Sequence, residues 1–222
     1  MLQTSTLSFL KSLKKNNNKP WFDENRKNYE AAKKDFEGLV QQVINTHGKN
    51  DPAIANLKAK ECMFRINRDV RFAKDKSPYK TNFGASINAG GKKSMRAGYY
   101  IHIEPGQSFV GGGLYMPQPA DLKKVRQEID YNLAEFKGII DGKKFKTIFG
   151  GLSNDPELKI TRVPQGFEKD SPAADYLVFK SFIAMQPVSD TAITEKKVIQ
   201  TIVTAFAALQ PLLGFLNRNI EE

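Results

Sequence analysis

Residues 65–80 read RINRDVRFAKDKSPYK, a stretch with six Arg or Lys side chains and two Asp side chains. Guanidinium groups can hold a phosphate or a carboxylate through paired N–H donors. Apolar and polar residues alternate over the first half of the stretch, which predicts a half-buried strand projecting Arg65 and Arg71 from one face. We therefore expect an anion site whose ligand is neutralised by Arg65, Arg68, Arg71 and Lys80.

The excess positive charge of the chain is concentrated around this stretch. The net charge is +10, yet Lys58 to Arg96 alone hold eleven basic and three acidic side chains, against 23 and 21 elsewhere. A localised positive field attracts phosphate, carboxylate or nucleic acid. The simpler alternative is a solvated surface that Asp69 and Asp75 partly neutralise. Arg68 favours the anion site, because it falls in an apolar register where an unpaired charge is costly and implies a partner.

Aromatic and imidazole side chains elsewhere could complete a pocket. We expect Trp21, Tyr79 and His102 to shape or line it, and Arg26 to reach its rim. His102 and Glu104 alternate onto one face of a predicted strand, where a carboxylate could orient the imidazole as a general base. No neighbouring residue marks a nucleophile, so the preferred role of His102 is to line a cleft. Whether the protein is an enzyme stays open.

Metal and nucleotide sites find little support in the sequence. Cys62 is the only cysteine and there are two histidines, so His and Cys alone cannot build a zinc site. The NAGGKKS segment lacks the spacing of an ATP-binding phosphate loop. Gly111, Gly112 and Gly113 are expected to mark close packing over a strand, with the Trp21 ring as one candidate cover. We expect no metal and no cofactor.

Hydrophobic periodicity predicts helices at both ends of the chain. Spacing of three and four residues indicates N-terminal helices within residues 5–47, with Asn18 as a cap, and a helix over about 119–138. A long final helix contains Pro211, where a bend is expected.

The predicted strands lie between these helices. A sheet core is expected over about residues 60–117, with a hairpin that turns at Pro105–Gly106, and later strands or extended segments over 157–164 and 176–189. Sequentially adjacent strands flanked by helices favour a single α+β domain over residues 1–222 with a largely antiparallel sheet.

Length and composition favour an ordinary globular protein. The 222 residues are 40% hydrophobic and 26% charged, enough for one substantial core. The single cysteine favours a reducing compartment. Polar residues interrupt the N-terminal leucines, so we expect no signal-peptide core there. No segment is expected to approach the roughly 20 apolar residues that are needed to cross a bilayer. We expect a soluble, cytoplasmic protein without membrane contact, and its oligomeric state stays open.

Four stretches of the chain together resemble the family known as domain of unknown function 2461. They run in order from near residue 16 to near residue 182 and read NNNKPWFDENRKNYE, RINRDVRFAKDKSPYKTNFGASI, GYYIHIEPGQSFVGGGLY and RVPQGFEKDSPAADYLVFKSF. The most specific part runs from Arg68 to Lys80. The resemblance implies relatives of similar size and brings no activity, cofactor or catalytic residue with it.

Three classes of function fit the basic stretch. The leading hypothesis is binding of a phosphate- or carboxylate-bearing small molecule in a cleft. A nucleic-acid-binding module would use the same patch, with bases stacking on Tyr79 or Phe72. A protein-interaction domain would dock an acidic partner on it.

Overall fold

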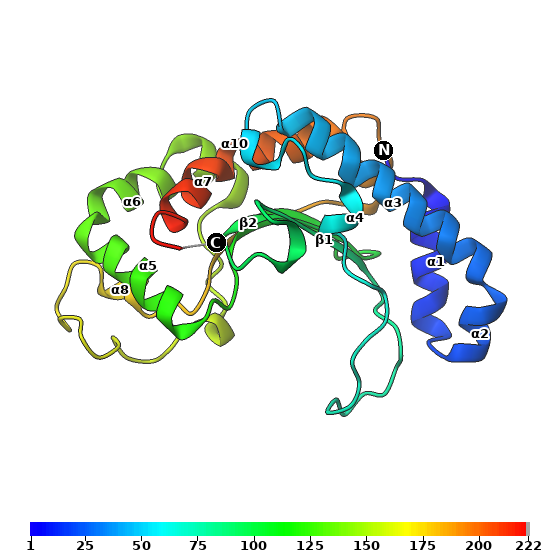
Figure 1. The fold of residues 1–222 in the computed structure, drawn as a ribbon, viewed down its shortest axis with the longest axis horizontal. Coiled ribbons are helices and arrows are strands. Elements are labelled where there is room, and N and C mark those ends of the chain that lie inside the picture. The colour runs from blue at the N-terminus through cyan, green and yellow to red at the C-terminus, as the bar shows by residue number, and fades with distance from the viewer. Residues whose placement is uncertain (221–222) are drawn as a thin grey trace.

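The computed structural model describes residues 1–220 and confirms an α+β fold with an antiparallel sheet (Figure 1). The sheet has the strand order β1-β2-β3-β4. Its strands are β1 (Phe83–Ile87), β2 (Gly98–Ile103), β3 (Phe109–Leu114) and β4 (Phe182–Pro187). The predicted hairpin is confirmed, since β2 and β3 pair directly and Gly106 in the turn has a positive φ of 77°.

Three helices form the N-terminal part: α1 (Thr4–Lys15), α2 (Lys19–Glu24) and α3 (Arg26–His47). Asn18 caps α2 as predicted, because its side chain accepts a hydrogen bond from the Trp21 N–H at 3.0 Å. Helical spacing continues past Asn25, but the backbone leaves the helical region there, with φ −99° and ψ 16°. The chain therefore forms two helices where the periodicity suggested one.

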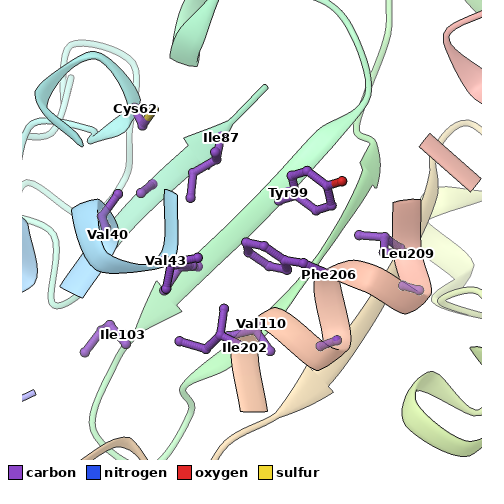
Figure 2. Packing of buried hydrophobic residues seen from close by; sticks show 14 of the residues in the cluster. Val40, Val43, Cys62, Ile87, Tyr99, Ile103, Val110, Ile202, Phe206 and Leu209 are labelled. Carbon is purple, nitrogen blue, oxygen red and sulfur yellow. The ribbon is translucent and has the colours of Figure 1, made fainter. Parts of the chain in front are cut away.

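Helices α3 and α10 (Val198–Leu216) cover one face of the sheet (Figure 1). Figure 2 shows Val43 of α3 and Phe206 of α10 packed against Tyr99 and Val110 of the sheet. By length and composition α10 could cross a membrane, with a mean hydropathy of 1.6, but 56% of that window is buried inside the protein. A core helix passes the same test, so the apolar character of α10 is explained by its packing.

The glycines of β3 permit this close packing. A Cβ added at Gly112 would lie 2.1 Å from the Gly98 carbonyl oxygen and 2.8 Å from Cδ2 of Leu209 on α10. The expected packing role is confirmed, but Trp21 is not the cover. Its ring stacks on Phe9, with centroids 6.1 Å apart.

Shorter helices complete the described part of the fold. They are α4 (Ala59–Cys62), α5 (Pro119–Tyr131), α6 (Leu133–Ile140), α7 (Lys143–Phe149), α8 (Ala174–Leu177) and α9 (Asp190–Thr194), with short 3-10 turns at Pro52–Ile54, Gly91–Lys93 and Pro156–Leu158. The helix predicted over 119–138 is thus interrupted at Asn132. Residues 157–164, predicted as a strand or an extended segment, form no strand, since only Lys159 bridges to Phe179. The strand predicted within 176–189 begins at Phe182.

The strand predicted from Cys62 to Arg71 is also wrong. The main chain touches β1 only at its start, where the Phe64 N–H donates to the Gly84 carbonyl at 2.9 Å. Residues 65–80, here called the basic arm, then leave the sheet as a long loop (Figure 1). The arm bonds to itself instead, through the Lys80 N–H to the Ile66 carbonyl at 2.8 Å and an isolated bridge between Asn67 and Tyr79. Of the alternating residues Phe64, Ile66 and Val70, only Ile66 is buried, so the alternation did not reflect pairing within the sheet.

Candidate functional site

The second face of the sheet carries a cleft of about 560 Å³. Antiparallel sheets that face solvent on one side usually present polar residues there. This face instead presents Tyr100 and Phe109, together with Ile183 and Met185 of β4. A sheet face that presents apolar side chains and that no helix of residues 1–220 covers indicates a binding surface, and the volume is typical of small-molecule sites.

Residues from neighbouring segments line the sides of the cleft above this sheet face. The complete cleft is here called the sheet cleft. Phe64, which directly precedes the basic arm, and Lys80, the last residue of the arm, line this cleft. Met95, in the connection between β1 and β2, and Tyr115, the residue after β3, line it as well. Phe64, Met95, Tyr115 and Met185 also belong to the exposed large hydrophobic side chains of residues 1–220. Four of the eight exposed large hydrophobic side chains of residues 1–220 therefore line this cleft.

Lys80 is the cation of the basic arm that reaches the sheet cleft. Its ammonium lies 5.4 Å from the centroid of the Phe64 ring, and no carboxylate within residues 1–220 pairs with it. Burial lowers the pKa of Lys80, and the nearby charge of Arg65 lowers it further. A half-buried ammonium without a counter-charge is a place where an anion would be stabilised.

His102 lies on the cleft floor with both ring nitrogens engaged. Nε2 is 3.2 Å from a Glu104 carboxylate oxygen, and Nδ1 is 3.4 Å from the Asn82 amide nitrogen. In the neutral ring this arrangement has Nε2–H donating to Glu104 and Nδ1 accepting from Asn82. The ring also stacks on Phe109, with centroids 4.7 Å apart. No nitrogen lone pair is left to take a proton from a ligand, so the contacts fit a residue that lines the cleft.

Tyr100 offers a hydroxyl inside the cleft. Its ring lies over Gly84, since a Cβ added there would be 2.5 Å from the Tyr100 oxygen. Burial raises the pKa of Tyr100, and the neighbouring Tyr115 raises it further. The phenol is therefore neutral at physiological pH, and within the described chain its hydroxyl has no hydrogen-bond partner.

Arg68 and Arg71 are engaged with carboxylates of the basic arm itself. Arg68 donates to Asp75 at 2.5 Å and to the Ser77 carbonyl at 3.0 Å, so it does have a partner. Arg71 holds Asp69 through two hydrogen bonds of 2.9 and 2.7 Å. Hydrogen bonds from Ser77, then from Arg68, lower the pKa of Asp75. These two guanidinium groups stabilise the arm and do not converge on one ligand.

Arg65 stands apart from both. Its side chain is exposed and lines a separate hollow of about 320 Å³ beside Phe64 and Lys92. Of the four predicted cations, only Lys80 therefore lines the sheet cleft. The charge of Arg65 affects the pKa of Lys80.

Three other predicted residues do not line the sheet cleft. Tyr79 is buried, and its ring stacks on Phe22 with centroids 3.9 Å apart. Arg26 pairs with Asp23 at 2.8 Å, and Trp21 packs on Phe9. Their positions make them supports for the N-terminal helices and for the root of the arm.

Sequence reasoning missed Tyr100, Phe109, Tyr115 and Met185 as cleft residues. A signal was present in residues 98–115, where apolar or aromatic side chains occupy both faces of the hairpin and not one face alone. A strand of that kind needs cover on both sides. Within residues 1–220 no cluster of three or more His, Cys, Asp or Glu could hold a metal ion.

Fold and cleft together define a two-layer α+β protein, with helices on one face of its sheet and an open cleft on the other. The family described as conserved hypothetical protein (DUF2461) matches residues 5–215, so the chain belongs to this family. No curated protein and no solved structure matches the chain.

Proposed function

We propose that the protein binds a small molecule bearing a carboxylate or phosphate group in the sheet cleft. The observation that carries this proposal is the Lys80 ammonium, half-buried among apolar side chains and without a carboxylate partner in residues 1–220. A bound anion would supply the missing counter-charge through a charge-assisted hydrogen bond. Arg65 adds attraction at longer range, and the Tyr100 hydroxyl is a second donor.

Titration calorimetry with benzoate and phenyl phosphate tests this proposal, with benzamide as the uncharged control. We expect both anions to bind more tightly than benzamide. Lys80→Gln should weaken anion binding about tenfold or more, because a charge-assisted hydrogen bond contributes about 1.5–3 kcal/mol. Lys80→Arg should retain most of the affinity.

Lys74→Gln is the matched control, since Lys74 is an exposed lysine of the same arm that does not line the cleft. It should bind the two anions as the unmodified protein does. Equal affinity for benzamide and benzoate, or an unchanged affinity in Lys80→Gln, would overturn the proposal.

A second candidate function rests on the exposed tip of the basic arm. Phe72 is 96% exposed, with the Arg71 guanidinium carbon 5.8 Å from its ring centroid. Exposed Lys74 and Lys76 follow in the chain. A protruding aromatic ring among cations suits stacking on the bases of single-stranded nucleic acid. Tyr79, buried under Phe22, is not available for this role.

Fluorescence anisotropy with a labelled single-stranded oligonucleotide tests this second candidate. We expect binding that weakens steeply with salt and falls about tenfold in Phe72→Ala, given the usual contribution of base stacking. Binding that is absent at low salt, or indifferent to Phe72, would exclude it.

A further inference from the structure

We infer that the ligand of the sheet cleft is an amphiphile, with its anionic head at Lys80 and an aliphatic tail across the sheet toward β4. The inference rests on the proposed function, because the same cleft holds the head group. It adds the chemical class of the ligand, which the charge of Lys80 alone does not specify.

The head position lies at the β1 edge of the sheet. Lys80 stands three residues before β1 and its ammonium faces the ring of Phe64. Phe64 in turn is fixed to β1 through its main-chain hydrogen bond to Gly84. An anion bound at Lys80 would therefore lie at the β1 edge of the open sheet face.

The cleft continues from there across the whole sheet. Its floor includes Gly98 of β2 and Gly113 of β3, which pair with each other, and Ile183 of β4, which pairs with Gly113. Three strand spacings of about 4.8 Å separate β1 from β4, roughly 14 Å. The row of Gly98, Gly113 and Ile183 also lies farther along the strands than the Gly84–His102 pair beside Phe64. A single aromatic ring near Phe64 and Tyr100, whose centroids are 6.4 Å apart, would leave most of this track empty.

Apolar side chains line much of the far part of the track. Gly98 and Gly113 carry no side chains of their own, but the Asn88 side chain lies over Gly98, where an added Cβ would be 2.4 Å from the Asn88 Cβ. Met95, Met185 and Tyr115 stand beside the track and are partly exposed. Unbranched methionine side chains adapt their shape to aliphatic surface. Among the polar lining residues, Ser86 lies on β1 and Asn88 follows it, whereas Ser94 and Arg96 flank Met95 before β2, and His102 lies on β2.

A series of carboxylates that differ only in chain length tests the inference. We expect octanoate to bind at least about tenfold more tightly than butanoate, because each buried methylene adds favourable transfer free energy. Dodecanoate, below its micellar concentration, should gain further. Octanamide, with the same tail and no charge, should bind weakly and should not respond to Lys80→Gln.

Substitution of the far wall separates tail recognition from head recognition. Tyr115→Ser and Met185→Ser should reduce the ratio of octanoate affinity to butanoate affinity about threefold, whereas Lys80→Gln should weaken both carboxylates alike. Tyr131→Ser is the matched control, since Tyr131 is 80% exposed, Tyr115 is 69% exposed, and Tyr131 lies outside the sheet cleft.

The two proposals fail in different ways. Benzoate binding that depends on Lys80, together with equal affinity for butanoate and octanoate, would overturn the amphiphile and leave the anion site standing. Octanamide binding as tightly as octanoate, with Lys80→Gln silent throughout, would overturn both.

Discussion

The side chain of Asn17 is hydrogen-bonded to the main chain of Tyr79, which lies far from it in the sequence. Its Nδ2 donates to the Tyr79 carbonyl at 2.9 Å, and its Oδ1 accepts from the Tyr79 N–H at 3.1 Å. The carboxamide thus satisfies both backbone groups of Tyr79, as a paired strand would. Tyr79 immediately precedes Lys80, so this contact fixes the root of the basic arm and the position of the cleft lysine.

Asn17→Ala should therefore destabilise the protein and weaken anion binding together. It leaves two partly buried backbone groups of Tyr79 without partners, which costs about 1–3 kcal/mol. Urea unfolding and benzoate titration measure the two effects. Asn28→Ala removes one exposed side-chain contact, to Asn25, and should change stability by less than about 0.5 kcal/mol. Equal stability of the two variants would contradict the assigned role of Asn17.

Anion binding should weaken at alkaline pH, and it should do so earlier than an ordinary lysine predicts. The pKa of Lys80 is lowered from 10.5, chiefly by burial and then by Arg65. Affinity should be constant while the ammonium is protonated and should fall as pH rises through this lowered pKa. Calorimetry across alkaline pH measures it. Lys80→Arg should remove the decline, because a guanidinium stays charged.

The same shift has a consequence for stability in the absence of ligand. The unfolded chain holds the Lys80 proton to higher pH than the folded chain does, so the Lys80 contribution to the free energy of unfolding increases as pH rises through the lowered pKa. Anion addition should reduce this increase, because a bound anion returns the pKa toward its ordinary value. A pKa of Lys80 that anions leave unchanged, observed by NMR titration, would argue against direct contact.

The two exposed arginines of the basic arm should differ in their effect on anion affinity. Arg65→Gln should weaken benzoate binding a few-fold, as expected for a nearby but exposed charge, on the order of 1 kcal/mol or less. Arg71→Gln should have no effect, since Arg71 is occupied by Asp69. Titration at low and high salt distinguishes them, because the Arg65 contribution should disappear on screening. A loss of binding in Arg71→Gln would restore the arginine-cluster hypothesis drawn from the sequence.

Glycine substitutions should separate close packing from helix propensity. Gly112→Ala places a Cβ 2.1 Å from a carbonyl oxygen of the sheet, at a φ of 154°, and should cost about 3 kcal/mol or more. Gly138→Ala lies on α6 with no atom within 4 Å of the added Cβ, and should stabilise the protein by up to about 1 kcal/mol. Thermal unfolding of both variants measures the contrast, and effects of the same sign would contradict it.

Cys62 should be inert in the folded protein. It is buried, and burial raises the pKa of its thiol to about 11. Because the thiolate is the reactive form, an aromatic disulfide reagent at neutral pH should label Cys62 only as fast as the protein unfolds. Addition of urea should accelerate the labelling to the rate of a free thiol. Rapid labelling without denaturant would show that Cys62 is not a core residue.

The sequence by itself determined the features that depend on neighbouring residues. Asn18 and Pro20 mark the start of α2, because capping and a fixed φ act within one turn. Residues 98–114 form a hairpin, since alternation and a Pro–Gly turn are local. Arg68 does have a partner, in Asp75 only seven residues away, although the strand register from which a partner was expected does not exist.

Tertiary structure alone decided how the basic arm and the sheet cleft are built. Alternation over residues 62–71 fitted a strand, but a strand exists only where a neighbour offers hydrogen bonds, and β1 offers them only near Phe64. The cleft joins Lys80, Tyr115 and Met185, which are distant in the chain, and the arm is held by Asn17, 62 residues before Tyr79. Such contacts follow from the packing of α3 and α10 on one sheet face only. That packing leaves the other face open, and no local pattern records which face will be covered.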